Sequence, residues 1–206
     1  MSLQNRVTPF GEIIAVLDRG LFTGNRGIIH DSASRTLLQK RWTSRRWLVC
    51  RCDFKGRRRS LMSAGSWTEL FFLDEATALA AGHRPCFECR RTEAEAFRQA
   101  FSGGERSVSV DEIDRVLHRE RLDGRAKRLH PIDGAWSALP DGAMIAGGAE
   151  AFLLVDGRAL RWAPGGYSIG QPAGAALLLT PPSTLRALSR GYRPVLHPSV
   201  AAACSG

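Results

Sequence analysis

Lysine is almost absent from this 206-residue chain, since only three of its 29 basic residues are lysine: Lys40, Lys55 and Lys127. Long apolar runs are absent as well, and none reaches the roughly 18 residues that a membrane-spanning helix requires. Residues 1–10 lack the apolar core of an export signal. The sequence therefore excludes membrane-spanning helices, and we expect a cytoplasmic protein in which thiols stay reduced.

Arginine carries nearly all of the positive charge and gives the chain a net charge of +9. A domain this basic commonly binds a polyanion, and the guanidinium group suits bidentate phosphate contacts. The densest arginine cluster is interleaved with Trp42, Trp47 and Phe54, whose rings can stack on bases. The alternative is that the arginines reflect genome bias and cover a solvated strand face. The cluster residues that we predict to contact nucleic acid are Arg45, Arg46, Arg51, Arg57, Arg58 and Arg59.

Four of the five cysteines lie in two close pairs, a spacing that points to a metal. Cys50 and Cys52 are at i and i+2 in a predicted strand, so both side chains are expected on one face. Cys86 and Cys89 form a C-x₂-C knuckle, in which backbone N–H groups turn inward toward the thiolates. Four thiolates make the closed tetrahedral site of structural zinc, and we predict such a site here.

Two alternatives to the four-cysteine site remain open. In the first, His83 or another histidine replaces Cys52 and gives a three-cysteine, one-histidine site. In the second, the upstream cysteine pair is structural and binds no metal. Cys204 lies in a tail of small residues, and we expect it to take no part. Arginines near the knuckle are expected to offset the negative charge of the thiolates. We predict that three of them also contact nucleic acid: Arg84, Arg90 and Arg91.

Residues 73–89 combine a strand end, a short alanine-rich helix and the sequence Gly-His-Arg-Pro-Cys-x-x-Cys. This pattern resembles the metal-binding domain of the Ada DNA-repair family over about residues 47–101. The resemblance implies a domain that binds DNA and in which one zinc thiolate of the first pair accepts a methyl group from a DNA methylphosphotriester. That family normally spaces its first pair more widely than the C-x-C found here. The zinc ligands that the resemblance implies are, in order, Cys50, Cys52, Cys86 and Cys89.

Apolar patterning and turn residues predict short strands and helices throughout the chain. The predicted strands cover residues 11–30, 41–54, 58–62, 68–73 and 175–180. Asp156-Gly157 between two apolar runs predicts a hairpin, whereas residues 165–170 are expected to form a loop. The predicted helices cover residues 74–81, 89–101 and 109–122, with another opened by Pro181-Pro182.

We therefore predict an α+β fold, with a small mixed sheet, a zinc knuckle and short helices, followed by a β-rich C-terminal part. Residues 1–122 form the zinc-containing region, with its zinc core over about 47–101. Residues 123–206 form the β-rich region packed on it, or both parts form one continuous domain.

The leading functional hypothesis is a zinc-binding protein that contacts nucleic acid, DNA more than RNA, with the zinc mainly structural. One alternative is an enzyme that modifies nucleic acid, either a repair methyl acceptor acting through a zinc thiolate or a nuclease. Another is a structural or protein-interaction module. A nuclease would bring together His30, His118, His130 and His197. The motifs around His30, His118 and His130 lack the spacing of known nucleases and hydrolases, so we expect structural roles for these three.

Overall fold

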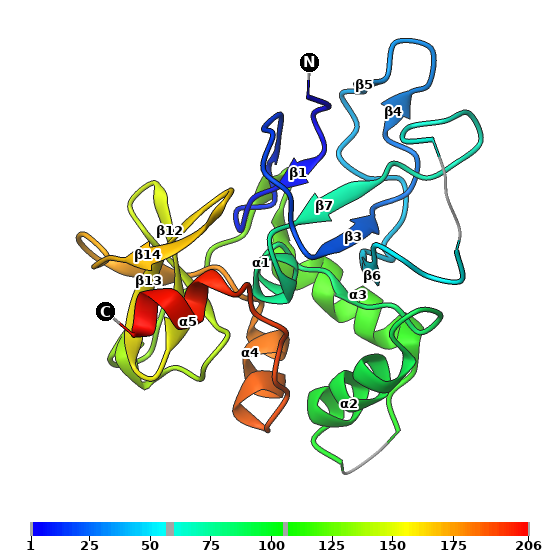
Figure 1. Cartoon of the computed structure of the whole chain (residues 1–206). Coiled ribbons are helices and arrows are strands. Elements are labelled where there is room, and N and C mark those ends of the chain that lie inside the picture. The colour runs from blue at the N-terminus through cyan, green and yellow to red at the C-terminus, as the bar shows by residue number, and fades with distance from the viewer. Residues whose placement is uncertain (1, 57–59, 105–106, 206) are drawn as a thin grey trace.

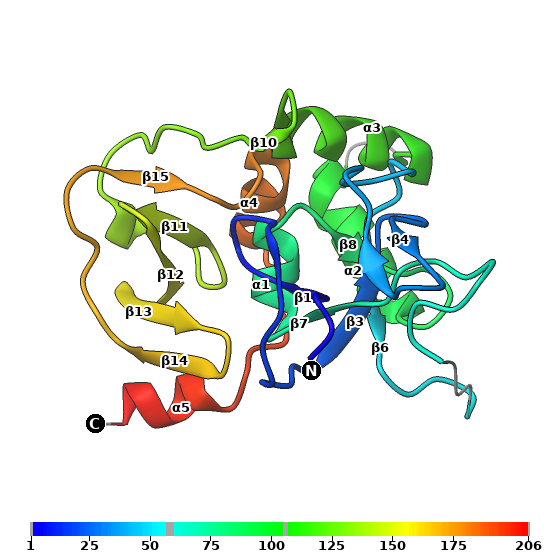
Figure 2. The same cartoon turned by 90° about the horizontal axis from the view of Figure 1, so that it is seen from above.

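The computed structural model describes residues 2–56, 60–104 and 107–205. Within these residues the chain forms two larger β-sheets, two short hairpins and five α-helices. The two larger sheets lie on opposite sides of the molecule, and helix α1 (Glu75–Ala80) lies between them (Figure 1, Figure 2). The mixture of helices and mixed sheets with a strand-rich C-terminal part confirms the predicted α+β class.

The N-terminal sheet is small and mixed, with the strand order β2-β1-β7-β3-β6-β8. The pairs β1–β7 and β6–β8 are parallel, and the other pairs are antiparallel. One face packs into an apolar cluster that includes Val49, Leu70 and Phe72. Its strands are β1 (Arg6–Val7), β2 (Ile13–Ile14), β3 (Phe22–Asn25), β6 (Leu48–Arg51), β7 (Leu70–Phe72) and β8 (Arg84–Pro85). The two short hairpins pair β4 (His30–Asp31) with β5 (Thr36–Leu37), and β9 (Leu122–Asp123) with β10 (Ala126–Lys127).

Helix α1 leads the chain from the N-terminal sheet into the cysteine knuckle. Its N-cap Asp74 accepts a hydrogen bond of 2.9 Å from the backbone N–H of Thr77. The chain then turns at Gly82, whose φ is +88° and where a Cβ would lie 2.6 Å from the side chain of Arg121. Only glycine combines that backbone conformation with that close approach, so it ends the helix and aims the chain into β8. The next two helices are α2 (Arg91–Ser102) and α3 (Val110–Arg121).

The C-terminal sheet is antiparallel, with the strand order β14-β13-β12-β11-β15. Strands β11 to β14 form a meander, and β15 crosses back to pair with β11. Its central strands are apolar on both faces, because Phe152 and Leu154 enter one core cluster while Ala151 and Leu153 enter another. Residues of α2, α3 and α4 cover the first face, and residues of α1 and α5 cover the second. The elements are η1 (Trp136–Ala138), β11 (Met144–Gly147), β12 (Glu150–Val155), β13 (Arg158–Ala163), β14 (Gly166–Ile169), β15 (Ala176–Leu178), α4 (Pro182–Ser189) and α5 (Ser199–Cys204).

The two halves of the chain share one interior. The first core cluster joins Leu79, Phe97 and Leu117 to residues of the C-terminal sheet, so packing continues across residue 122. The only two tyrosines of the chain, both buried, also connect the halves. The hydroxyl of Tyr167 donates to Asp74 at 3.0 Å, and that of Tyr192 donates to Glu75 at 2.5 Å.

Some local predictions fail for identifiable reasons. Residues 165–170 contain strand β14 rather than a loop alone, because Tyr167 between the glycines is buried and its strand pairs with β13. In the strand predicted over 58–62, residues 58 and 59 lie outside the described part of the chain, and residues 60–62 form no strand. Helix α5 was not predicted because its small residues carry no periodic pattern. None of the helices in the described ranges has the length and apolar character needed to cross a bilayer.

Candidate metal centre

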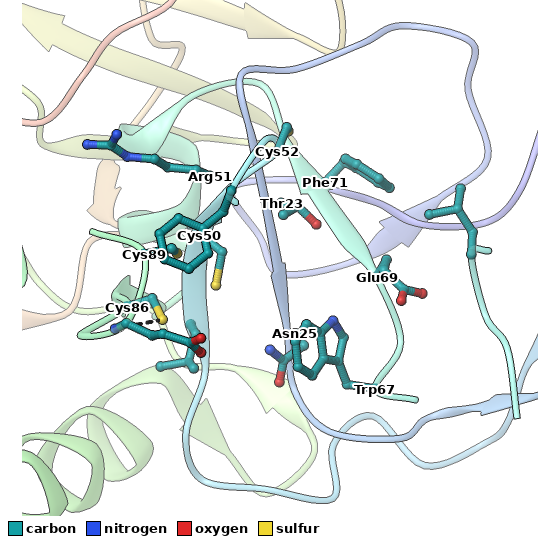
Figure 3. Close-up of a pocket in the computed structure, with 14 residues that line it drawn as sticks. Thr23, Asn25, Cys50, Arg51, Cys52, Trp67, Glu69, Phe71, Cys86 and Cys89 are labelled. Atoms are coloured by element: carbon teal, nitrogen blue, oxygen red, sulfur yellow. Dashed lines mark hydrogen bonds between the residues drawn. The ribbon is translucent and has the colours of Figure 1, made fainter. Parts of the chain in front are cut away.

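Cys50, Cys86 and Cys89 are brought together by the parallel pairing of β6 with β8. The backbone N–H of Arg84 donates to Trp47 O at 3.0 Å, and that of Cys86 donates to Val49 O at 3.1 Å. These bonds hold the start of the knuckle beside the strand that carries Cys50. The side chains of Cys50 and Cys86 point toward one another across the gap between the two segments (Figure 3).

The three sulfur atoms meet the geometric demands of a thiolate metal site. They all lie within 4.8 Å of one another. A zinc ion with Zn–S bonds of about 2.3 Å needs sulfur atoms about 3.8 Å apart in tetrahedral geometry, which small side-chain rotations supply. The backbone N–H of Glu88 donates to Cys86 Sγ at 3.4 Å, so the inward-turned N–H predicted for the knuckle is present. The residues therefore fit a metal held by three thiolates.

The three sulfur atoms are electrostatically coupled. Hydrogen bonds from the thiols of Cys50 and Cys89 lower the pKa of Cys86 to about 2. The same contact with the Cys86 thiolate raises the pKa of Cys50. One sulfur atom is thus stabilised as a thiolate by the other two, and a bound cation would remove the remaining protons.

Cys52 does not join the three converging cysteines. Strand β6 ends at Arg51, so the alternation that would put Cys50 and Cys52 on one face stops before Cys52. Its side chain is exposed, and its thiol donates to Leu21 O at 3.5 Å. The prediction of Cys52 as a fourth ligand assumed that the strand continues through residue 52, but the strand ends one residue earlier.

His83 does not replace Cys52 as the fourth ligand. Its ring is fully buried, 4.6 Å from the ring of Phe72 and 5.1 Å from that of Trp47. Burial, with Arg26 and Arg121 nearby, holds the pKa of His83 well below its usual value. The neutral ring accepts a hydrogen bond from Arg26 Nε at 3.3 Å. The histidine is a core residue, and its role is packing.

An open pocket of about 210 Å³ adjoins the three cysteines. Cys50, Cys86 and Cys89 form part of its wall, and Cys52 lies on the same pocket. Half of the other ten lining residues are apolar or aromatic, and the other half are polar or charged and include Glu69 and Glu88 (Figure 3). Three cysteines beside an open pocket could hold a metal ion and leave one coordination position for a fourth ligand.

Four of the predicted phosphate-binding arginines are exposed. Arg45 and Arg91 are solvent-accessible, and Arg46 and Arg51 are exposed with ion pairs to Asp111 at 3.3 Å and Glu93 at 3.4 Å. Exposed ion pairs of this kind contribute little to stability and exchange readily for other partners. Arg51 is one of the residues that line the pocket, and its side chain extends away from the cysteine sulfur atoms (Figure 3). The predicted phosphate contacts Arg57, Arg58 and Arg59 lie outside the described residues.

Arg84 and Arg90 are buried, which corrects their prediction as phosphate contacts. Arg84 makes two hydrogen bonds of 2.8 Å to the carboxylate of Asp114. Arg90 donates to Glu75 at 2.8 Å, and its side chain has no solvent exposure. Both guanidinium groups already have internal carboxylate partners, so they position the knuckle rather than bind a ligand.

A buried cation cluster beneath the knuckle was not predicted from the sequence. The guanidinium carbons of Arg26 and Arg121 each lie 3.9 Å from the ring centroid of Trp47. Trp47 is 2% exposed, so it supports these cations and is not available to stack on a base. No motif or spacing signals this cluster, since the three residues are far apart in the sequence.

The remaining histidines each have a hydrogen-bond partner within the fold. His30 Nδ1 lies 2.7 Å from Thr68 Oγ1, and His130 Nε2 lies 2.8 Å from Glu120 O. His118 is hydrogen-bonded to Arg121, and His197 Nδ1 lies 2.8 Å from Ser199 Oγ. Across the described ranges, the three cysteines are the one group of three or more potential metal ligands that converges.

Comparison with protein-family models, with curated proteins and with solved structures finds no match to the chain. The chemistry of the site is therefore inferred from its own geometry.

Proposed function

We propose that this chain is a cytoplasmic zinc-binding protein that contacts nucleic acid, DNA in preference to RNA. The observation that carries the proposal is the convergence of three cysteine sulfur atoms beside an open pocket, in a chain with a net charge of +9. Soft thiolates favour zinc over magnesium or calcium, and a reducing compartment keeps all three cysteines available as ligands. The zinc would be mainly structural, holding strand β6 to the knuckle.

The proposed nucleic-acid contact rests on the exposed arginines near the metal centre. Arg51 directly follows Cys50, and Arg91 begins the helix that follows Cys89. Arg45 and Arg46 lie on the segment that leads into β6. Of these four arginines Arg51 lines the pocket, and guanidinium groups at all four positions can neutralise phosphates.

The metal part of the proposal predicts different outcomes for neighbouring cysteines. Purified wild-type protein should contain zinc, and Cys86→Ser should lose it because one of three ligands is gone. Cys52→Ser is the matched control and should keep its zinc, since Cys52 lies outside the cluster. Elemental analysis measures the metal, and wild-type protein that binds no zinc when refolded with it would contradict the proposal.

The nucleic-acid part is tested with the same zinc-loaded protein by fluorescence anisotropy on labelled DNA and RNA over a range of salt. Arg51→Ala should weaken binding and reduce the salt slope by about 0.9 per lost phosphate contact. Arg158→Ala, an exposed arginine of the C-terminal sheet, should change neither. If the protein binds zinc but no nucleic acid at low salt, the nucleic-acid contact is rejected, and the alternative of a structural or protein-interaction module stands.

A second candidate is a repair methyl acceptor, favoured by the half-buried Cys50 thiol that lines the pocket. The Cys50 thiolate, whose proton a bound metal would displace, would attack the methyl carbon of a phosphate triester. A carbon–sulfur bond would form as the carbon–oxygen bond breaks, and the phosphate diester would leave as an anion. Peptide mass spectrometry after incubation with methylated DNA should then find a methyl group on Cys50. Unmodified cysteines throughout would exclude this alternative.

A further inference from the structure

The pocket beside the cysteines is the second face of the N-terminal sheet. Successive side chains of a strand point to opposite faces of the sheet. Residues that alternate with those of the buried face therefore point to this second face. Cys50, Thr23 and Phe71 pair across β6, β3 and β7 and form one row on this face. Asn25 pairs with Leu48 and adds a second row. All five residues line the pocket, and the other described residues of its wall come from the end of β6, from loops and from the knuckle rather than from a helix.

Aromatic rings stand at the edges of this open face. Phe71 lines the pocket from β7, and the guanidinium carbon of Arg6 lies 4.7 Å from its ring centroid. Trp67 lines the pocket and is 38% exposed. Phe54 adds a third ring to the wall. Labelled side chains of Trp67, Asn25 and Phe71 lie across the gap from Cys50 and Cys86 (Figure 3).

The size and chemistry of the pocket restrict its occupant. Its volume of about 210 Å³ is below the roughly 300–1,000 Å³ of pockets that hold drug-sized ligands. A single planar group fits this space better than a nucleoside with its sugar and phosphate. Aromatic rings stack on the π-face of any base, and the amide of Asn25 can bond to a base edge. A base inside a duplex cannot reach such a pocket without leaving its stack.

We propose that this sheet face binds one unstacked nucleobase of a single-stranded nucleic acid, with Trp67 and Phe71 as stacking platforms beside the cysteines. The inference rests on the proposed nucleic-acid contact, and it assigns the bases to the pocket and the phosphates to the surrounding arginines. It gives a specific role to an open aromatic face that a purely structural zinc site does not require.

The test compares two strands of equal charge on the full-length, zinc-loaded protein. One is a labelled thymidine oligomer, and the other carries the same number of phosphates on abasic sugars. We expect the base-bearing strand to bind about 5- to 150-fold more tightly, the range for stacking of a base on an aromatic side chain. Trp67→Leu should abolish most of this preference. Ile169→Ala, which removes an exposed apolar side chain from β14, is the control and should keep it.

Circular dichroism and zinc content show whether each variant is folded. If Trp67→Leu does not fold, Phe71→Leu replaces it as the test variant. Equal binding of the two strands by wild-type protein would overturn the pocket assignment while leaving the phosphate contacts in place. If neither strand binds, the proposed function fails, and a titration with free nucleosides then decides the pocket separately. Quenching of tryptophan fluorescence by nucleoside that disappears in Trp67→Leu would support base binding in the pocket. No quenching at millimolar nucleoside would overturn the pocket assignment.

Discussion

The two sheets of this protein have interiors of different chemistry. Around the N-terminal sheet, the interior contains charged groups that include Arg26, Arg84 and Asp114. In the described residues from 143 onward, the polar groups of the buried side chains are hydroxyls, those of Tyr167, Thr180, Ser183, Thr184 and Tyr192. Buried charge is costly and is tolerated when each group has a precise partner. The three converging cysteines lie in the half of the molecule that accepts this cost.

The difference indicates what each half does. The apolar interior of the C-terminal sheet supplies stability through area removed from water. The buried ion pairs of the N-terminal half give little net stability, but they permit few alternative arrangements of the residues around the knuckle. Arg84 and Arg90, on either side of Cys86 and Cys89, are both held in this way.

The largest effect is expected from breaking a buried ion pair. Asp114→Ala leaves the guanidinium of Arg84 buried without its carboxylate, so the free energy of unfolding should fall by about 3–5 kcal/mol. Urea unfolding measures the change. The double variant Arg84→Met/Asp114→Leu removes both charges and should be more stable than Asp114→Ala. A double variant as unstable as the single one would contradict the distinction between the two interiors.

A smaller effect is expected from Lys127, a partly buried cation of the N-terminal interior. Burial, with Arg26 and Arg121 nearby, lowers the pKa of Lys127 from 10.5 to about 7. Between about pH 7 and pH 10.5, Lys127 is protonated in the unfolded chain but neutral in the folded protein. The free energy of unfolding should therefore rise with pH over this range. Below pH 7 the cost of the buried charge is fully present.

Lys127→Met should therefore be more stable than wild type at pH 6, on the order of 1–3 kcal/mol, and should lack the rise above pH 7. Thermal or urea unfolding across this pH range compares the two proteins. Parallel stability curves for wild type and Lys127→Met would show that the lysine is not desolvated in the folded state.

The smallest effect is expected in the apolar interior. Ile145 is fully buried in β11, and Ile145→Val removes one methylene without changing a charge. The free energy of unfolding should fall by about 0.5–1.5 kcal/mol, equally at pH 6 and pH 9. A marked pH dependence of this loss would mean that the C-terminal interior is coupled to the charges of the other half.

Local signals in the sequence predicted much of the fold. The turn Asp156-Gly157 has positive φ at both residues, as a two-residue hairpin requires, and it joins β12 to β13. The acidic start and glycine end of α1 were also identified, because capping chemistry depends on adjacent residues. Helix α5 and strand β14 were missed, because their burial depends on partners far away in the chain.

The candidate site was predicted only as far as its local geometry allowed. The knuckle at Cys86 and Cys89 has its own backbone pattern, and it does meet Cys50. The position of Cys52 depended on where β6 ends, and no residue type marks that end. The burial of Arg84 depended on Asp114 in a distant helix, so sequence alone could not separate a structural arginine from a phosphate-binding one.

The two tyrosine contacts at the start of α1 limit how the protein can be divided. Tyr167 and Tyr192 come from the C-terminal half, yet they bind the adjacent carboxylates Asp74 and Glu75, which precede the cysteine knuckle. A fragment ending before the C-terminal sheet would expose both carboxylates together with the apolar face of α1. The cysteine knuckle is therefore not an independently folding unit, and grafting it into another protein would require including the C-terminal sheet as well.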